Sequence, residues 1–132
     1  MPITVRWDDP EQTITYLTFT DTLHVNDLFA AWHEEITMQT SVSHSVYSLN
    51  DLTRAQPVLR GINLRGLVEF VQQHQAPNLK MTVQVAPSSV IRHSLQMIAK
   101  LMPHEVHVVA TLAEAYAIIE ADKATSQERR AG

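Results

Sequence analysis

The stretch Lys80–Pro87 constrains the fold more than any other part of the sequence. Apolar residues alternate along it and Pro87 ends the pattern, which is typical of a β-strand. A helical pattern of apolar residues follows at once, from Ser88 to Met102. A strand at Val106–Ala110 and a helix at Leu112–Glu120 repeat the plan. This alternation predicts parallel strands joined by helical crossovers, and therefore an α/β fold.

The residues before this stretch add five expected elements. They are strands at Ile3–Trp7 and Thr13–Thr20, a helix from about Val25 to Ile36, a strand at Ser45–Asp51 and a helix from about Asn63 to His74. Residues 52–61 contain Pro57 and Gly61 and are expected to be an irregular connection. The predicted order is β-β-α-β-α-β-α-β-α in one domain, residues 1–122, followed by a polar, disordered C-terminal tail at residues 123–132.

The first helix has the clearest apolar stripe, formed by Val25, Leu28, Phe29, Trp32 and Ile36. Glu34 and Glu35 lie off this stripe, so we expect both carboxylates on a solvated helix face. In the strand that follows, alternation places Ser48 and Asn50 on one side of the sheet and Tyr47 and Leu49 on the other.

Composition excludes several classes of function. The net charge is −4, so the chain has no overall basic field for nucleic acid. There is no cysteine, which removes disulfides, thiolate nucleophiles and thiolate metal sites. No apolar run approaches the length of a membrane span, and the N-terminus has no apolar signal core. We therefore expect a soluble cytoplasmic protein that needs no cofactor.

The order of elements, together with Thr-Leu-x-Glu-Ala at Thr111–Ala115, resembles the SpoIIAA-like branch of the STAS domains, over about residues 3–121. STAS domains occur in anti-sigma-factor antagonists and at the ends of sulfate transporters. The resemblance implies a mixed sheet with helices packed mainly on one face. It also implies a non-enzymatic module that acts through contact with a protein partner.

The phosphorylation motif of antagonist STAS domains is not retained here. That motif reads Asp-Ser-Ser-Gly-Leu or Asp-Ser-Thr-Gly-Leu at the start of the second helix, and its serine is phosphorylated. In this chain Gly66 and Leu67 match, Asn63 replaces the aspartate, and Leu64 occupies the serine position. Leucine has no hydroxyl, so we predict no phosphorylation switch there. The nearest hydroxyl on the N-terminal side is that of Thr53.

The same segment suggests a partner-binding or anion-binding site. Arg54, Arg60 and Arg65 cluster where no acidic residue lies between Leu52 and Leu67. Free N–H groups at a helix N-terminus favour anions, and Asn63 can cap that helix. Three solvated arginines on a loop are the plainer interpretation.

The third helix offers more apolar surface than one sheet needs. One stripe contains Ile91, Leu95, Ile98 and Met102, and an adjacent stripe contains Val90, Met97 and Leu101. The second stripe is a predicted dimer or ligand face, although packing on a neighbouring helix would also explain it.

Catalytic and metal-binding patterns are weak. His104 and His107 form the closest histidine pair, but no third ligand lies nearby in the sequence, so we predict no metal site. Ser88 and Ser89 lack the glycines of a nucleophile elbow or a phosphate loop, and capping of the following helix explains them.

Three functions remain open. The first is a non-enzymatic STAS-like interaction module, and the second is a carrier or sensor of a small apolar ligand or lipid. The third is a hydrolase or isomerase with His and Asp residues brought together in space, although no nucleophile motif supports it. An internal cavity lined by residues such as Phe29, Trp32, Leu67, Phe70 and Met97 would favour the carrier. A filled core with an exposed apolar patch would favour the interaction module.

Overall fold

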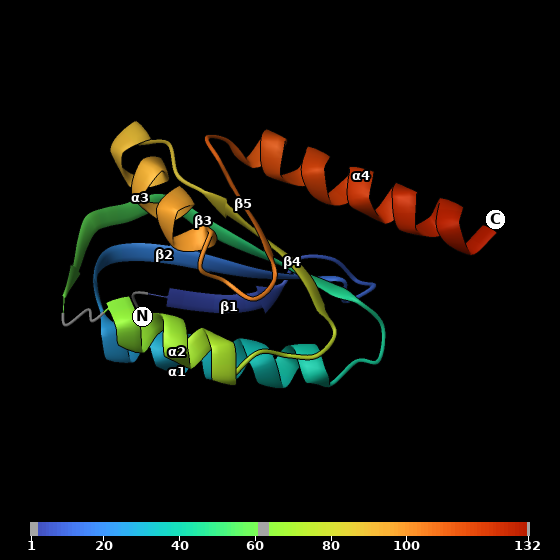
Figure 1. The fold of residues 1–132 in the computed structure, drawn as a ribbon, viewed down its shortest axis with the longest axis horizontal. Helices are drawn as coiled ribbons and strands as arrows, with labels where there is room; N and C mark the ends of the chain where they lie inside the picture. The colour runs from blue at the N-terminus through green and yellow to red at the C-terminus, as the bar shows by residue number, and fades with distance from the viewer. Residues whose placement is uncertain (1–2, 61–63, 132) are drawn as a thin grey trace.

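The computed structural model describes residues 3–60 and 64–131, and of residues 21–23, 56–60, 64 and 128–131 it describes the backbone alone. Its elements follow the predicted order (Figure 1). They are β1 (Ile3–Trp7), β2 (Ile14–His24), α1 (Val25–Thr40), β3 (Val46–Arg60), α2 (Leu64–Gln73), β4 (Leu79–Val85), α3 (Ser89–Ala99), β5 (Glu105–Val109) and α4 (Leu112–Ala131). None of the helices in these residues is both long and apolar enough to cross a bilayer.

The five strands form one mixed sheet in the order β1-β2-β3-β4-β5. β1 and β2 are antiparallel, and every later neighbouring pair is parallel. The strand at Leu79–Val85 therefore lies inside the sheet, between the strands of Val46–Arg60 and Glu105–Val109. A helical crossover joins each parallel pair.

The helices cover the sheet unequally. α1 and α2 lie next to each other on one side, and α4 lies on the opposite side (Figure 1). α1, α2 and α3 line one cavity together with the sheet, so these three helices share a face. This arrangement agrees with the prediction of helices packed mainly on one face.

Two apolar cores result from the alternation of side chains along the strands. Beneath α4, residues of four strands pack with Ala115 and Ile119. On the other face, a smaller core joins β1 and β2 to Leu28 and Ala31 of α1 and Leu67 of α2. The larger core contains Ile14, Tyr16, Tyr47, Leu49, Met81, Val83, Val85 and Val109.

The predicted cap of α3 is present. The Ser88 hydroxyl accepts a hydrogen bond from the Ile91 N–H at 3.4 Å, which caps α3. The Thr111 hydroxyl accepts from the Glu114 N–H at 3.2 Å and donates to the Glu114 carboxylate at 3.0 Å. α1 has a cap that the sequence analysis did not identify, in which the His24 ring accepts from the Asn26 N–H.

The expected irregular connection at residues 52–61 was wrong. β3 continues to Arg60 because it pairs with a β2 that is also longer than predicted and reaches His24. The register shifts twice along this extension, and Pro57 falls within the second shift. A bulge tolerates a proline because the residues in it do not all donate to the ladder.

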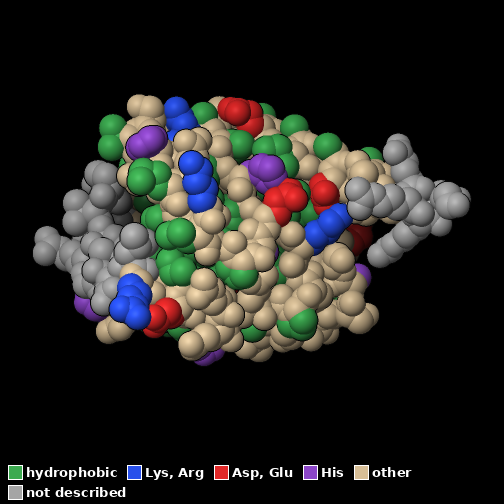
Figure 2. All heavy atoms as spheres, in the orientation of Figure 1, with side chains coloured by type: hydrophobic (Ala, Val, Ile, Leu, Met, Phe, Trp, Pro, Cys, Tyr) green, Lys and Arg blue, Asp and Glu red, His purple; other side chains and the backbone are tan. Residues whose placement is uncertain are grey.

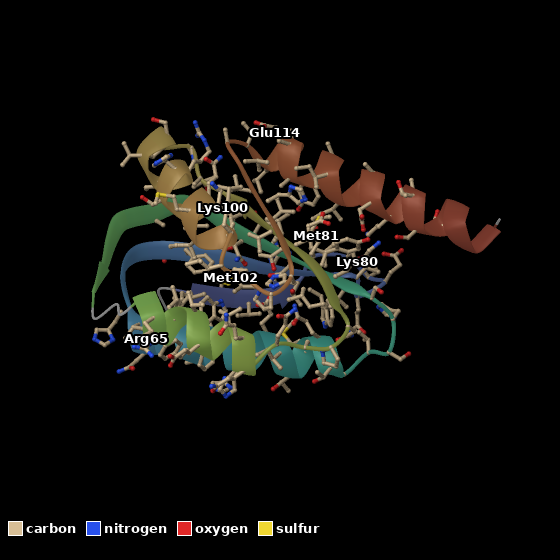
Figure 3. The ribbon with its side chains drawn as sticks, in the orientation of Figure 1. Arg65, Lys80, Met81, Lys100, Met102 and Glu114 are labelled. Carbon is tan, nitrogen blue, oxygen red and sulfur yellow. The ribbon has the colours of Figure 1, made fainter. Side chains whose placement is uncertain are left out.

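The predicted end of the last helix near Glu120 was also wrong, since α4 continues to Ala131 through residues expected to form a disordered tail. Polar contacts hold this extension. Tyr47 donates to Asp122 at 2.6 Å, and Lys123 donates to Thr13 at 2.8 Å. Lys80, labelled beside α4 in Figure 3, pairs with Asp122 at 2.7 Å.

Replacement of Ile119 tests the core beneath α4. Ile119 is fully buried, so Ile119→Ala removes apolar contacts and leaves a cavity. We expect a loss of about 2–5 kcal/mol in the free energy of unfolding, measured by urea denaturation. Glu120→Ala changes an exposed neighbour on the same helix and should cost less than about 0.5 kcal/mol. Equal losses in the two variants would contradict this packing of α4.

Candidate functional site

A cavity of about 190 Å³ lies between the sheet and the helices α1, α2 and α3. Its sheet side is formed by Ser48 and Asn50 of β3, Thr82 and Gln84 of β4, and Val106 of β5. Alternation explains why the space is there. In the middle of β3 and β4, Tyr47, Leu49, Met81 and Val83 point to the α4 face. The residues between them, Ser48, Asn50, Thr82 and Gln84, therefore face the cavity with shorter or polar side chains, and Leu52 and Leu79 line it as well.

The helices contribute apolar walls. Trp32 comes from α1, Leu67 and Phe70 from α2, and Leu95 and Ile98 from α3. Phe70 also stacks against Trp32, with ring centroids 5.7 Å apart, which ties α2 to α1. Met102 lines the cavity from the turn after α3, and Figure 3 labels it between α3 and α2.

Three of the five residues named for an apolar cavity do line it, namely Trp32, Leu67 and Phe70. Phe29 instead packs on the ring of Phe70 with a centroid distance of 4.5 Å. Met97 lies on the outer side of α3, where 59% of it is exposed. Hydrophobic side chains are visible at the surface over α3 and between α3 and α2 (Figure 2).

A buried polar cluster borders the cavity. The Glu35 carboxyl of α1 is only 7% exposed. Thr15 of β2 donates to Glu35 Oε2 at 2.7 Å, and the Ser48 hydroxyl of β3 donates to the same oxygen. Gln39, one turn further along α1, donates to the Thr15 hydroxyl at 3.1 Å. This cluster connects α1 to two neighbouring strands.

The buried position raises the pKa of Glu35 to about 6, because desolvation penalises the charged form. The hydrogen bonds from Ser48 and Thr15 oppose that shift. The expectation that Glu35 lies on a solvated face was therefore wrong. Leu28, Ala31, Glu35 and Gln39 form the buried face of α1, so the face is rotated from the apolar stripe.

The polar alternation of the strand at Ser45–Asp51 was the signal that could have found this cluster. Ser48 and Asn50 point to the covered face, and covered polar groups need partners. A glutamate and a glutamine at i and i+4 on the neighbouring helix, Glu35 and Gln39, can supply them.

A second polar contact lies elsewhere on the cavity lining. The Thr82 hydroxyl and His104 Nε2 are 2.7 Å apart. Burial lowers the pKa of His104, which favours the neutral ring. Among the described residues that line the cavity, the only ionisable side chains are Glu35, His74 and His104, and none of them is a lysine or an arginine.

The structure divides the two apolar stripes of the third helix. Leu95, Ile98 and Met102 of the first stripe line the cavity. The second stripe points outward, with Val90 exposed by 75% and Leu101 by 51%. Together with Met97 these residues, of which Leu101 lies in the turn just after the helix, form what we call the outer face of α3. The sequence analysis predicted this group as a dimer or ligand face, and it lies away from the cavity.

The arginine site is only partly described. Arg54 is an exposed residue of β3 whose charge lies close enough to Asp51 to favour its ionised form. Arg65 projects from α2 (Figure 3) and forms a 3.1 Å ion pair with Glu69. The Arg60 side chain and Asn63 lie outside the described residues. Both described arginines thus have a carboxylate nearby, and the proposed anion site stays a prediction.

The histidine pair does not converge. His104 contacts Thr82, whereas His107 lies 2.7 Å from the Glu105 carboxylate. Within the described residues, no three His, Asp or Glu side chains are grouped so that they could hold a metal ion.

Comparison with known proteins supports the fold. No protein-family model matches the sequence, and no curated protein matches it. Among solved structures, the chain is similar to an uncharacterized protein of the DUF3478 family with a SpoIIAA-like fold from Shewanella loihica PV-4. The TM-score is 0.67 at 10% sequence identity, covering 87% of this chain and 91% of that chain. The predicted SpoIIAA-like fold is therefore confirmed, and at this identity the similarity concerns the fold alone.

Titration of Glu35 gives a prediction for stability. Between pH 4.5, the ordinary pKa of the group, and about 6, its pKa in the folded protein, the native state holds this proton more tightly than the unfolded chain. This group therefore makes the free energy of unfolding fall as the pH rises through that window, by about 2 kcal/mol. The Glu35→Gln variant has no carboxyl at this position, so this decrease in the free energy of unfolding should disappear. Urea denaturation from pH 4 to 7 measures it.

The matched control is Glu34→Gln, which removes the exposed carboxylate next in the chain. It should keep the full decrease of the wild type. The assignment would be wrong if Glu35→Gln and wild type showed the same dependence on pH.

Proposed function

We propose that this protein binds a small, mainly apolar molecule in the cavity between the sheet and α1, α2 and α3, and acts as a carrier or sensor. The observation that carries the proposal is the cavity itself, about 190 Å³ with apolar walls and a few polar groups. Ligand pockets combine these two features. For scale, an engineered apolar cavity of about 150 Å³ binds benzene.

We further propose that the cavity binds its ligand without transforming it. A hydroxyl nucleophile requires a base within hydrogen-bond reach and a group that orients this base. In the described part of the chain, Ser48 bonds to the carboxylate of Glu35 and to Asn50, and no histidine joins them. His104 bonds instead to Thr82. A cytoplasmic location belongs to the same proposal.

Filling the cavity should abolish binding. Leu95 lines the cavity, and Leu95→Trp adds volume inside it. Ser94→Trp places the same side chain on the exposed side of α3 and serves as the control. We expect toluene to raise the melting temperature of wild type and of Ser94→Trp, but not that of Leu95→Trp, since binding to the folded state stabilises it. Equal responses of the two variants would count against binding in this cavity.

A second candidate function is interaction with a protein partner or with a second copy of the chain. The specific observation is the outer face of α3, where the exposed fractions of Val90, Met97 and Leu101 are 75%, 59% and 51%. Contiguous exposed apolar side chains mark interaction sites. Isologous dimers are the commonest form of self-association in soluble proteins.

Sedimentation of wild type and Met97→Glu tests this surface. A charge at the centre of an apolar interface is expensive to bury, so we expect the variant to be monomeric at concentrations where wild type is a dimer. Ser94→Glu, on the same helix, is the control. If wild type sediments as a monomer at every concentration, self-association through this face is excluded.

A further inference from the structure

We propose that Glu35 selects the ligand, and that the cavity takes a small neutral molecule whose single hydroxyl group donates a hydrogen bond to Glu35 Oε1. This inference rests on the proposed function, because it names the ligand class for the same cavity. The inference concerns recognition of the ligand's hydroxyl group by Glu35, whereas the proposed function concerns binding of the ligand's apolar part by the cavity walls.

The first argument is the unequal use of the two carboxylate oxygens. Thr15 and Ser48 both donate to Oε2. Within the described part of the chain, no residue donates to Oε1. Glu35 nevertheless lines the cavity and is 93% shielded from solvent, being 7% exposed. Oε1 is not one of the fully buried unpartnered atoms of the described residues, so it keeps accessible surface on which a ligand hydroxyl can donate a hydrogen bond.

The second argument is charge. The described lining contains no lysine or arginine, so an anionic head group would meet the Glu35 carboxylate without a compensating cation. A cationic head group would require the desolvation of two charges in an apolar cavity. A neutral hydroxyl donates to a carboxylate and forms a strong charge-assisted hydrogen bond without adding a charge.

Two buried polar side-chain atoms of the described residues lack a hydrogen-bond partner, and neither competes for the ligand. One is Oδ1 of Asn78, which does not line the cavity. Among the described residues His104 Nδ1 has no hydrogen-bond partner, but this atom is fully buried, so a molecule in the cavity has no access to it. Its other ring nitrogen is occupied by Thr82 at 2.7 Å. Glu35 is the only carboxylate among the described residues that line the cavity, so its Oε1 is the strongest acceptor there.

The third argument is size and shape. A cavity of about 190 Å³ is somewhat larger than the roughly 150 Å³ that holds benzene, so a single ring with small substituents suits it. Trp32 and Phe70 supply aromatic walls that pack well against such a ring. These features point to a phenol or an alcohol of similar size.

The experiment compares p-cresol with toluene, which differ by one hydroxyl group, by isothermal titration calorimetry at pH 8. At this pH the Glu35 carboxyl, with a pKa of about 6, is ionised. A phenol titrates near pH 10, as tyrosine does, and is neutral. Wild type should bind p-cresol about tenfold more tightly than toluene, since hydrogen bonds to charged groups are the strong ones.

Two variants locate the preference. Glu35→Leu removes the acceptor and should bring the two affinities within about twofold of each other while toluene still binds, which shows that the cavity is intact. Glu34→Leu, next in the chain and exposed, should keep the wild-type preference. If Glu35→Leu does not fold, Glu35→Gln keeps the side-chain shape and should reduce the preference, because a neutral amide is a weaker acceptor than a carboxylate.

The outcomes separate the two proposals. Binding of toluene and p-cresol with equal affinity to wild type would overturn the role of Glu35 and leave the apolar cavity standing. A preference for p-cresol that survives in Glu35→Gln and Glu35→Leu would also overturn it. Failure of both molecules to bind wild type would overturn the ligand-binding function and this inference with it.

Discussion

The alternation of side chains along the two central strands, β3 and β4, determines the rest of the structure. One face of these strands carries Tyr47, Leu49, Met81 and Val83, which pack under α4 and fill the space there. The other face carries Ser48, Asn50, Thr82 and Gln84, which cannot fill the space beneath three helices. One side of the sheet is therefore a closed core, and the other side contains the cavity.

Polar side chains that lie beneath helices need hydrogen-bond partners, and the Glu35 cluster supplies them for Thr15 and Ser48 on the sheet. Thr15 and Ser48 bind one carboxylate oxygen, and Gln39 binds Thr15 in turn. The cluster adds hydrogen bonds between α1 and the strands β2 and β3 to the apolar packing of Leu28 and Ala31 of α1. The second oxygen has no donor among the described residues, and we propose that the same side chain both supports the structure and recognises the ligand.

The sequence was sufficient to predict the order of elements and the sheet, because apolar periodicity is strong in β4, α3 and β5. The predictions were wrong where strand pairing or polar contacts, rather than apolar periodicity, determine the structure. β3 extends to Arg60 through pairing with β2, a contact between distant segments that periodicity does not encode. α4 extends to Ala131 through polar contacts such as Tyr47 with Asp122, which a search for apolar residues passes over. The sequence analysis placed Glu35 on the solvated face of its helix, because its hydrogen-bond partners Thr15 and Ser48 lie on strands β2 and β3 and periodicity within the helix does not show them.

The most direct test of this account is a crystal structure of the protein under xenon pressure. Xenon enters apolar cavities, in which water finds too few hydrogen-bond partners to be stable. The account predicts xenon density between the sheet and α1, α2 and α3, in contact with residues such as Trp32, Leu95 and Val106. Helices α2 and α3 closed onto the sheet, with no density at that position, would contradict it.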